Sequence, residues 1–368
     1  GDSTDTLLSL AEEISDTHHG REVDMLITTG EQVSISLMAM TFAHLGASAV
    51  SLTGAQAGIC CRGVHGKAFI DKVLPSRVFQ ELEKGNIVIV AGFQGLLPNG
   101  DVATLGRGGS DATAVALAGA MHADMCEIFT DVDGVYSADP RYCPEAIKMQ
   151  EITNIEMLEL ARLGAGVMQP RSVELGLQYH IPIHVRSTFT NEEGTIIREE
   201  STLEGNNCII KGVAQDTNTA RISVLNVKNI PGIAYKVFQS LADDNIDVDM
   251  IVQSVQTSND NMTDIVFTIN SADLNDARKS LEKLKTEGLI PEVVYDDDTA
   301  KISVVGAGML GTPGIAARMF GALGSVGINI LIVSTSEISV SCLIKREDVN
   351  KAVQAIHREF FEKSEING

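Results

Sequence analysis

The sequence predicts a three-layer α/β domain with a mostly parallel sheet, followed by two small α+β domains. Three observations in the 368 residues lead to this prediction. Up to about residue 198, short runs of valine and isoleucine alternate with helical patterns, which is typical of a sheet covered on both faces. Residues 190–207 are polar and carry several glutamates, as expected of a domain boundary. Beyond them the sequence contains an internal repeat.

The elements of the first domain follow from the spacing of apolar residues. Residues 2–5 are typical of a helix start and lead into apolar residues from Leu7 onward, so we expect a helix first. Since an α/β domain rarely begins in this way, we expect that the start of the domain precedes residue 1. A short apolar run, 25–28, comes before the next helix. The further expected helices are 31–45, 77–84, 111–121, 155–163 and 172–179, and the expected strands are 49–52, 86–91 (buried), 126–130 and 183–186.

The internal repeat consists of two copies with matching landmarks. Pro-Gly-Ile-Ala occurs at 231–234 and again at 313–316, and a similar Ile-Ser-Val stretch precedes each. Each copy reads strand, Pro-Gly loop, helix, strand, strand, helix, an order that builds a ferredoxin-like α+β unit. We therefore expect the two copies to pack side by side, with domain bounds at 1–206, 207–298 and 299–368.

Charge and cysteine content narrow the range of functions. The 28 lysines and arginines against 49 aspartates and glutamates give a net charge of −21, which should repel nucleic acid and anionic membranes. An anionic substrate would therefore need arginines, backbone amides or a metal ion at its site. No apolar run approaches the roughly 18 residues of a membrane span. The six cysteines form no C-x-x-C pair, which favours reduced thiols in the cytoplasm, although the adjacent Cys60 and Cys61 leave a redox pair open.

A glycine-rich loop at 105–111, Leu-Gly-Arg-Gly-Gly-Ser-Asp, is the most specific motif of the first domain. Its glycines let the backbone approach a ligand, and free amides at the start of the next helix favour an anion. Arg107 adds a side chain suited to a carboxylate or phosphate. The alternative is a plain glycine turn with a helix cap, which is less consistent with an arginine between the glycines.

The segment 130–141 follows an expected buried strand and combines acidic residues, a tyrosine and an arginine. Loops at the carboxyl ends of parallel strands are where such sheets bind ligands, so this is a second candidate binding segment, with an acidic surface turn as the alternative. Glu31 would suit either an ammonium group or the positive end of a helix dipole. The G-x-G-x-x-G pattern at 306–311 is not interpreted as a dinucleotide site, because no acidic residue follows at the required distance.

Together these motifs resemble the aspartokinases of the amino-acid kinase family, over essentially the whole chain. The matching stretches are 1–5 (Gly-Asp-Ser-Thr-Asp), 29–32 (Thr-Gly-Glu-Gln), 105–111, 130–141 and 334–338 (Ser-Thr-Ser-Glu-Ile). The repeats resemble tandem ACT domains, which acetylglutamate, glutamate and uridylate kinases lack. The resemblance implies transfer of the γ-phosphate of ATP, with Mg²⁺, to the side-chain carboxylate of L-aspartate, the first step toward lysine, threonine and methionine.

The resemblance also implies roles for residues at matching positions. Arg107 would bind the α-carboxylate of aspartate and Glu31 its ammonium group, while Asp111 would steer magnesium or a phosphate-binding lysine. No direct protein ligand of the metal is implied. The implied aspartate residues are Thr4, Glu31, Arg107, Gly108, Gly109, Ser110 and Asp111, and the implied ATP residues are Thr130, Asp131, Tyr136 and Arg141.

Two departures from the family pattern concern the phosphate. The family begins with a Lys-x-Gly-Gly-Ser/Thr strand whose lysine contacts the transferred phosphate, and we expect that this chain starts just after it. Where many members have a second lysine, this chain has Gly166, for which Arg171 or Arg141 would compensate. The alternative function is a non-catalytic, amino-acid-binding regulator derived from the same family.

For the ACT domains, the resemblance implies feedback control by threonine, lysine or both, and self-association into a homodimer or larger homo-oligomer. Gly232 and Gly314 would present helix-start amides to an α-carboxylate, and Asp249 would bind an ammonium group. Asn229 stands where relatives often have aspartate, which would change the preferred effector. A repeat that only dimerises is the alternative. The implied effector residues are Asn229, Gly232, Ala234, Asp247, Val248, Asp249, Gln253, Ile315, Ala316, Asn329, Ile330 and Ser336.

Overall fold

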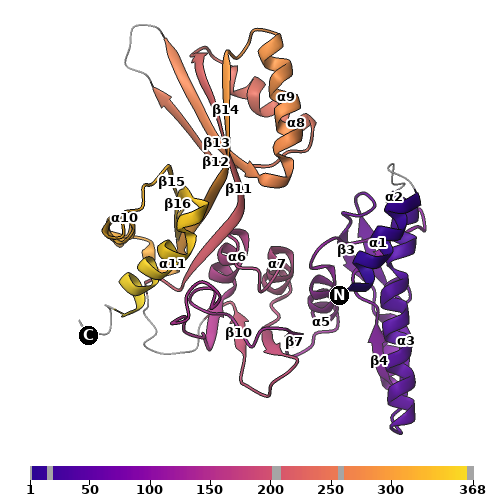
Figure 1. The fold of residues 1–368 in the computed structure, drawn as a ribbon. Helices are drawn as coiled ribbons and strands as arrows, with labels where there is room; N and C mark the ends of the chain where they lie inside the picture. Colours follow the sequence, from indigo (N-terminus) through magenta and orange to yellow (C-terminus); the bar gives the residue numbers. More distant parts are fainter. Residues whose placement is uncertain (1, 15–19, 201–208, 256–260, 363–368) are drawn as a thin grey trace. The chain divides into compact units, whose positions relative to one another are not determined.

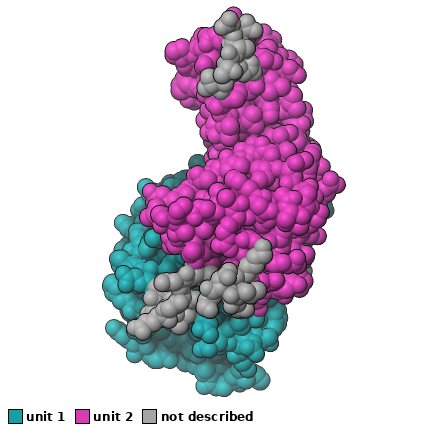
Figure 2. Space-filling view, turned by 90° about the vertical axis from the view of Figure 1, so that its left-hand side faces the viewer, with its two compact units in different colours: residues 1–135, 148–162, 166–205 teal, residues 136–147, 163–165, 206–368 magenta. Residues whose placement is uncertain are grey.

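The computed structural model describes residues 2–14, 20–200, 209–255 and 261–362. The chain separates into two compact units (Figure 2). Unit 1 comprises residues 1–135, 148–162 and 166–205, and unit 2 comprises residues 136–147, 163–165 and 206–368. The predicted order of an α/β domain followed by an antiparallel α+β repeat is confirmed.

The first half of unit 1 contains four helices and two small sheets (Figure 1). Strands β1 and β4 pair in parallel, and a second, four-stranded sheet has the order β3-β2-β5-β6. The helices are α1 (Asp2–Ile14), α2 (Gly20–Ile27), α3 (Thr29–His44) and α4 (Ser76–Glu83). The strands are β1 (Ala49–Leu52), β2 (Ile59–Arg62), β3 (Phe69–Val73), β4 (Ile87–Val90), β5 (Gln94–Leu96) and β6 (Val102–Thr104).

The second half of unit 1 is a mixed four-stranded sheet with the order β7-β9-β10-β8, accompanied by three helices. Strands β7 and β9 run parallel, while β9 and β10 run antiparallel. The helices are α5 (Gly109–Ala120), α6 (Asn154–Arg162) and α7 (Pro170–Tyr179). The strands are β7 (Cys126–Thr130), β8 (Glu151–Thr153), β9 (Ile183–Ser187) and β10 (Thr195–Arg198).

The elements with strong apolar periodicity lie where they were predicted, and two details differ. The apolar run 25–28 belongs to helix α2 and its end. The strand expected to be buried at 86–91 is only half-buried, and Ile87 is 40% exposed, so that expectation was wrong. The physical reason is that β4 has a single strand partner, β1, within the described residues, so one edge of β4 is not covered by a neighbouring strand.

Unit 2 is built on a six-stranded antiparallel sheet with the order β12-β13-β11-β14-β16-β15 (Figure 1). Helices α8 and α9 pack together, and α10 packs on α11. The strands are β11 (Gly212–Lys228), β12 (Val248–Val255), β13 (Met262–Asn270), β14 (Glu292–Val305), β15 (Ile332–Thr335) and β16 (Ser339–Lys345). The helices are α8 (Ile233–Asp243), α9 (Leu274–Thr286), α10 (Ile315–Ser325) and α11 (Val349–His357).

The two long central strands, β11 and β14, each take part in both copies of the repeat. Residues 221–225 of β11 pair with 292–296 of β14 beside the core of the first copy. Residues 212–216 of β11 pair with 301–305 of β14 beside the core of the second copy. Each copy therefore receives one end of a strand that belongs to the other copy. The boundary predicted at 298/299 falls inside β14, so the copies share two continuous strands instead of meeting at a linker.

The glycine pattern at 306–311 has a packing role. A Cβ atom placed on Gly306 would lie 2.1 Å from the carbonyl oxygen of Ile209, and one on Gly308 would lie 2.9 Å from the Cα of Ile209. These glycines are required because the loop after β14 presses against another stretch of backbone. Close packing therefore accounts for these glycines without a dinucleotide site.

A substitution in the first repeat core should test this packing. Phe267 is fully buried and packs edge-to-face on Phe238, with ring centroids 5.4 Å apart. Phe267→Ala should lower the free energy of unfolding of unit 2 by about 3–5 kcal/mol, because it removes a large buried ring and leaves a cavity. Urea unfolding followed by circular dichroism measures the change. Phe189→Ala, at a ring that is 79% exposed, is the control, and equal stability losses in the two variants would contradict the description of the core.

Candidate functional site

The glycine loop before α5 has the backbone geometry of a ligand-binding turn. Gly106 and Gly108 have φ angles of 72° and 71°, in the left-handed region that favours glycine. A Cβ atom on Gly108 would lie 2.0 Å from Cγ of Gln169. Gly108 caps α5 without a side-chain hydrogen bond to the first turn. The amide of Gly109 donates to the carbonyl oxygen of Gly106 at 3.1 Å, which leaves the amides of Ser110 and Asp111 as the first-turn donors for an anion.

Arg107 lines a cavity of about 410 Å³ together with two other cations, Lys67 and Arg171. Arg107 is exposed and forms no ion pair with any described residue. Arg171 donates a hydrogen bond from Nη1 to the carbonyl oxygen of Ala68, at 2.9 Å. The only acid in the lining, Glu174, is paired with Arg162 at 2.6 Å. The cavity therefore has an excess of positive charge and suits an anionic ligand.

Ser110 and Asp111 lie in the first turn of α5 and do not line the cavity of Arg107. Ser110 lines a second, mostly apolar cavity of about 380 Å³, opposite Gly92. Asp111 is half-buried, and this burial raises the pKa of its carboxyl group. Arg107 and Ser110 thus border different cavities, and neither cavity has Glu31 among its lining residues.

Glu31 carries the clearest sign of an unfilled polar site. One carboxylate oxygen, Oε2, is buried and receives no hydrogen bond from any described residue. Burial raises the pKa of this carboxyl group, against a smaller opposing effect of a backbone hydrogen bond. Thr4 is half-buried on α1, and the side chains of its neighbours Ser3 and Leu7 lie beside Gly30. A buried, unpaired carboxylate favours a cationic partner, so Glu31 fits an ammonium group.

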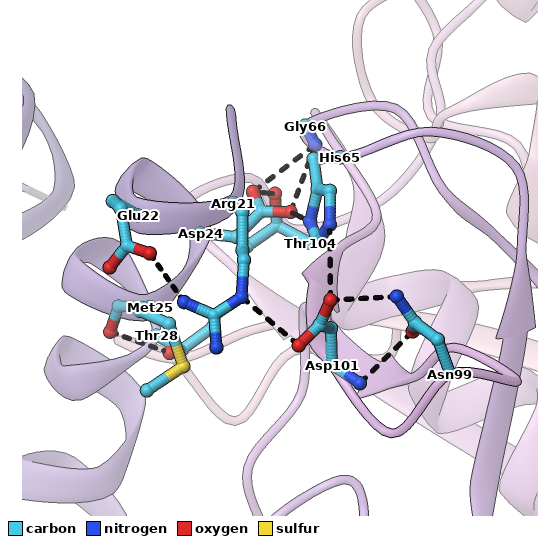
Figure 3. A network of polar contacts seen from close by, with 10 residues as sticks. All are labelled: Arg21, Glu22, Asp24, Met25, Thr28, His65, Gly66, Asn99, Asp101 and Thr104. Atoms are coloured by element: carbon cyan, nitrogen blue, oxygen red, sulfur yellow. Dashed lines mark hydrogen bonds and ion pairs between the residues drawn. The ribbon is translucent and has the colours of Figure 1, made fainter. Parts of the chain in front are cut away.

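A buried network that the sequence analysis did not identify holds the loop after β2 (Figure 3). The carboxylate of Asp24 is fully buried and accepts hydrogen bonds from Thr104 Oγ1 at 2.6 Å and from the amide of Gly66 at 3.0 Å. It also contacts Nδ1 of His65 at 2.9 Å. The other ring nitrogen of His65 lies 4.0 Å from Asp101. The sequence signal for this network is an aspartate directly before the apolar run 25–28.

The second predicted binding segment is divided between the two units. Thr130 and Asp131 lie in unit 1 at the carboxyl end of β7, where Thr130 Oγ1 donates to Asp131 at 3.1 Å. Tyr136 and Arg141 lie in unit 2. Arg141 binds Asp139 through two nitrogens, with Nη2 to Oδ2 at 2.7 Å. Burial opposes ionisation of Asp139, but the hydrogen bonds from Arg141 outweigh it and lower the pKa of that carboxyl group.

The segment 136–147 is anchored to the second repeat. Ser137 Oγ lies 2.9 Å from Nε2 of the buried His357 on α11, and the carbonyl oxygen of Ser137 accepts from the amide of Val213 at 2.7 Å. Ala138 and Cys143 belong to the hydrophobic core of the second copy. A segment predicted to bind nucleotide is therefore, physically, part of the repeat unit.

The predicted effector residues of the two Pro-Gly loops lie at helix starts. Gly232 and Gly314 cap α8 and α10 with φ angles of 91° and 95°, and neither helix has a side-chain cap. Ala234 and Ala316 are half-buried beside these caps. Ile315 is a core residue with 5% exposure, so only its main chain could contact a ligand. Asn229 is exposed, and its amide donates to the carbonyl oxygen of Asn261 at 2.8 Å.

The remaining predicted effector residues lie at the two outer strands of the six-stranded sheet. A small cluster of Met250, Ile332 and Leu343 brings β12 into contact with β15 and β16. Asp249 forms an ion pair with the ammonium group of Lys301, which is 4% exposed. The residues on or beside β12 are Asp247, Val248, Asp249 and Gln253, and those beside β15 are Asn329, Ile330 and Ser336, whose hydroxyl lies 2.8 Å from that of Ser339.

Comparisons with known proteins agree with these features. Residues 1–187 match the model of the amino acid kinase family, and residues 204–284 and 302–360 match an ACT domain model. The chain is 46% identical to an aspartokinase of Corynebacterium glutamicum over 364 residues, which is 98% of this chain and 86% of the relative. The crystal structure of E. coli aspartokinase III in complex with aspartate and ADP has a TM-score of 0.79 at 26% identity, and covers 97% of this chain and 80% of its own. The complex of that enzyme with lysine and aspartate has a TM-score of 0.73 at 26% identity, with coverages of 97% and 79%.

The anchoring of 136–147 makes a prediction about pH. Burial lowers the pKa of His357 below its ordinary value of 6.5, although Glu145 and Glu362 oppose the shift. Below pH 6.5, His357 binds a proton more readily in the unfolded chain than in the folded chain. The stability of unit 2 should therefore fall as the pH falls below about 6.5. His357→Gln, which does not titrate, should weaken this dependence. Urea unfolding at pH 7.5 and 5.5 measures it, with the exposed His44→Gln as control. Equal pH dependence in all three proteins would refute the prediction.

Proposed function

Since this chain belongs to the aspartokinase family and is an aspartate kinase with ACT domains, we propose that the loop before α5 and Glu31 together bind its substrate, L-aspartate. The observation that carries this proposal is one cation and one buried carboxylate oxygen, each of which lacks an oppositely charged partner among the described residues. Arg107 is a free cation at a positively charged cavity, and Glu31 holds a buried carboxylate oxygen without a partner. An α-amino acid has one carboxylate, which can bind Arg107, and one ammonium group, which can bind Glu31.

The reaction joins two anions. An oxygen of the aspartate side-chain carboxylate attacks the γ-phosphorus of ATP, the bond from phosphorus to the bridging oxygen breaks, and ADP leaves. The attacking carboxylate is already ionised at neutral pH, so no general base is needed. The residues of this chain therefore act by binding, orientation and charge neutralisation.

We assign the remaining roles on the same basis. Arg107 binds the α-carboxylate, and the amide of Gly108 and the hydroxyl groups of Ser110 and Thr4 orient the substrate. Gly109 shapes the loop, because its amide donates to the carbonyl oxygen of Gly106 at 3.1 Å, and Asp111 steers the metal or phosphate. Thr130, Asp131, Tyr136 and Arg141 bind ATP, and E. coli aspartokinase III was solved with ADP.

Mg²⁺ enters the proposal with the nucleotide. Among the described residues no group of three or more histidine, cysteine, aspartate or glutamate side chains is arranged to hold a metal ion. We propose that the magnesium ion is held mainly by phosphate oxygens, where it neutralises phosphate charge. Arg171 or Arg141 is proposed to compensate for the family lysine at Gly166, and both are held in place, Arg171 by the carbonyl oxygen of Ala68 and Arg141 by Asp139.

The site of action is proposed to be the cytoplasm. The five described cysteines are free thiols, as expected of a reducing compartment. Within the described residues, no helix combines the length and hydropathy that crossing a membrane requires.

The ACT domains are proposed to bind threonine, lysine or both, and to join chains into a homodimer or larger assembly. E. coli aspartokinase III was solved with lysine and aspartate. Asp249 is the proposed partner of the effector ammonium, which would then compete with Lys301 for its carboxylate. Because 136–147 is part of unit 2, a shift within the repeat also moves Tyr136 and Arg141. Coupling between such sites is typically about 1–3 kcal/mol.

Removal of the proposed carboxylate ligand tests the substrate site. Arg107→Ala should raise KM for aspartate strongly, by the equivalent of about 2–5 kcal/mol, because a charge-assisted contact is lost. KM for ATP should change little. An ATP- and magnesium-dependent hydroxamate assay with aspartate, and with glutamate for comparison, measures this. Arg62→Ala, another exposed arginine, is the control. An unchanged KM for aspartate in Arg107→Ala would refute the assignment.

Removal of effector contacts tests the regulatory site. Gln253→Ala and Asn329→Ala should release feedback inhibition while leaving uninhibited activity nearly intact, because both exposed side chains lie far along the chain from the kinase motifs. Threonine and lysine are titrated singly and together against activity and in calorimetry. Gln239→Ala, on the exposed face of α8, is the control. If neither amino acid binds the unmodified enzyme at millimolar concentrations, the repeat serves assembly alone.

A further inference from the structure

We propose that Lys67 is a second substrate-binding residue, which holds the α-carboxylate of aspartate together with Arg107, and that Asp24 positions it. This inference rests on the proposed binding of aspartate at Arg107 and adds to it one cation and one buried positioning residue. Neither residue belongs to the motifs that identified the family.

The first support is the charge of the cavity. Lys67, Arg107 and Arg171 line the same cavity of about 410 Å³, in a chain with a net charge of −21. Lys67 is exposed and forms no ion pair with any described residue, as is true of Arg107. Three cations that line one cavity repel one another, and an anion bound between them lowers this repulsion. Because Arg171 is engaged with main-chain carbonyls, Lys67 is the partner that remains for the ligand of Arg107.

The second support is the contact between the two loops that carry these cations. A Cβ atom on Gly106 would lie 3.3 Å from the carbonyl oxygen of Gly66. The residue before Lys67 therefore lies against the residue before Arg107. This close approach places the two side chains at one cavity, although they lie far apart in the sequence.

The third support is the way in which the main chain on both sides of Lys67 is held (Figure 3). The amide of Gly66 donates to the buried carboxylate of Asp24 at 3.0 Å, and the amide of Ala68 donates to the carbonyl oxygen of Thr104 at 3.0 Å. The hydroxyl of Thr104 in turn donates to Asp24 at 2.6 Å. Asp24 is 0% exposed and is absent from the cavity lining. It therefore acts through the loop and not on the ligand.

A lysine at this position is suited to a ligand carboxylate that is already bound by Arg107. The planar guanidinium of Arg107 can bind both oxygens of a carboxylate, whereas an ammonium group adds a compact point charge at one of them. A substrate with its α-carboxylate between these two cations is bound through its unreactive end. Its side-chain carboxylate remains free to attack the phosphate.

The test compares Lys67→Met with Lys72→Met in the full-length enzyme. Lys72 is an exposed lysine of the adjacent strand β3 and is absent from the cavity lining. Lys67→Met should raise KM and the calorimetric Kd for aspartate by about tenfold or more, the loss of one charge-assisted contact. It should leave kcat and KM for ATP within about twofold, and Lys67→Arg should restore most of the affinity. Lys72→Met should match the unmodified enzyme.

The outcomes separate this inference from the proposed function. If Arg107→Ala weakens aspartate binding and Lys67→Met does not, the inference is overturned and the proposed substrate site stands. If neither variant changes aspartate binding, the substrate site itself is wrongly placed. Circular dichroism and melting temperature confirm that each variant is folded, and a folded Lys67→Met with an unchanged Kd overturns the role of Lys67.

The positioning role of Asp24 is tested by a double-mutant cycle. Asp24→Asn should raise KM for aspartate with little effect on kcat, and the double variant with Lys67→Met should bind aspartate no more weakly than Lys67→Met alone. Thr104→Ser, which keeps the hydroxyl donor, should preserve binding. Fully additive effects of the Asp24 and Lys67 substitutions would overturn the positioning role, because a purely structural aspartate would weaken binding independently of Lys67.

Discussion

A chain with a net charge of −21 must bind two anions and bring them into contact, and this constraint governs the arrangement of the site. Most of the surface repels both substrates, so the positive charge must be local and held by the backbone. The glycine loop before α5 leaves the amides of Ser110 and Asp111 without a side-chain cap, and the adjacent cavity gathers three of the 28 basic side chains. The single acid in that cavity is already neutralised by Arg162. The fold therefore supplies a local excess of positive charge at this cavity, although the chain as a whole is negatively charged.

The second constraint is that the segment proposed to bind nucleotide is divided between the two compact units. Asp131 lies in unit 1, while Tyr136 and Arg141 lie in unit 2 with the ACT repeat. The hydrogen bond between Ser137 and His357, and the burial of Ala138 in the second repeat core, fix this segment to unit 2. A part of the segment proposed to bind nucleotide is therefore built into the core of the regulatory repeat.

The sequence was most informative where structure depends on neighbours in the chain. The periodic apolar runs predicted β7, β9 and α5, and the loop before α5 could be interpreted from its own seven residues. It was least informative where a contact joins distant residues. Asp24 and Thr104 are 80 residues apart, and Ser137 and His357 are 220 residues apart, so no local pattern marks either pair. Strands of three residues, such as β5 and β8, were missed because so short a run carries little periodicity.

The exchange of strand ends between the two repeats has a consequence for synthesis on the ribosome. The start of β11 leaves the ribosome long before its partner, residues 301–305 at the end of β14. Synthesis proceeds at about 5–20 residues per second, so for several seconds a strand edge of the nascent chain has no partner. Such an edge can pair with a neighbouring nascent chain. The order of the strands thus delays the pairing of the start of β11 until all of β14 has been made.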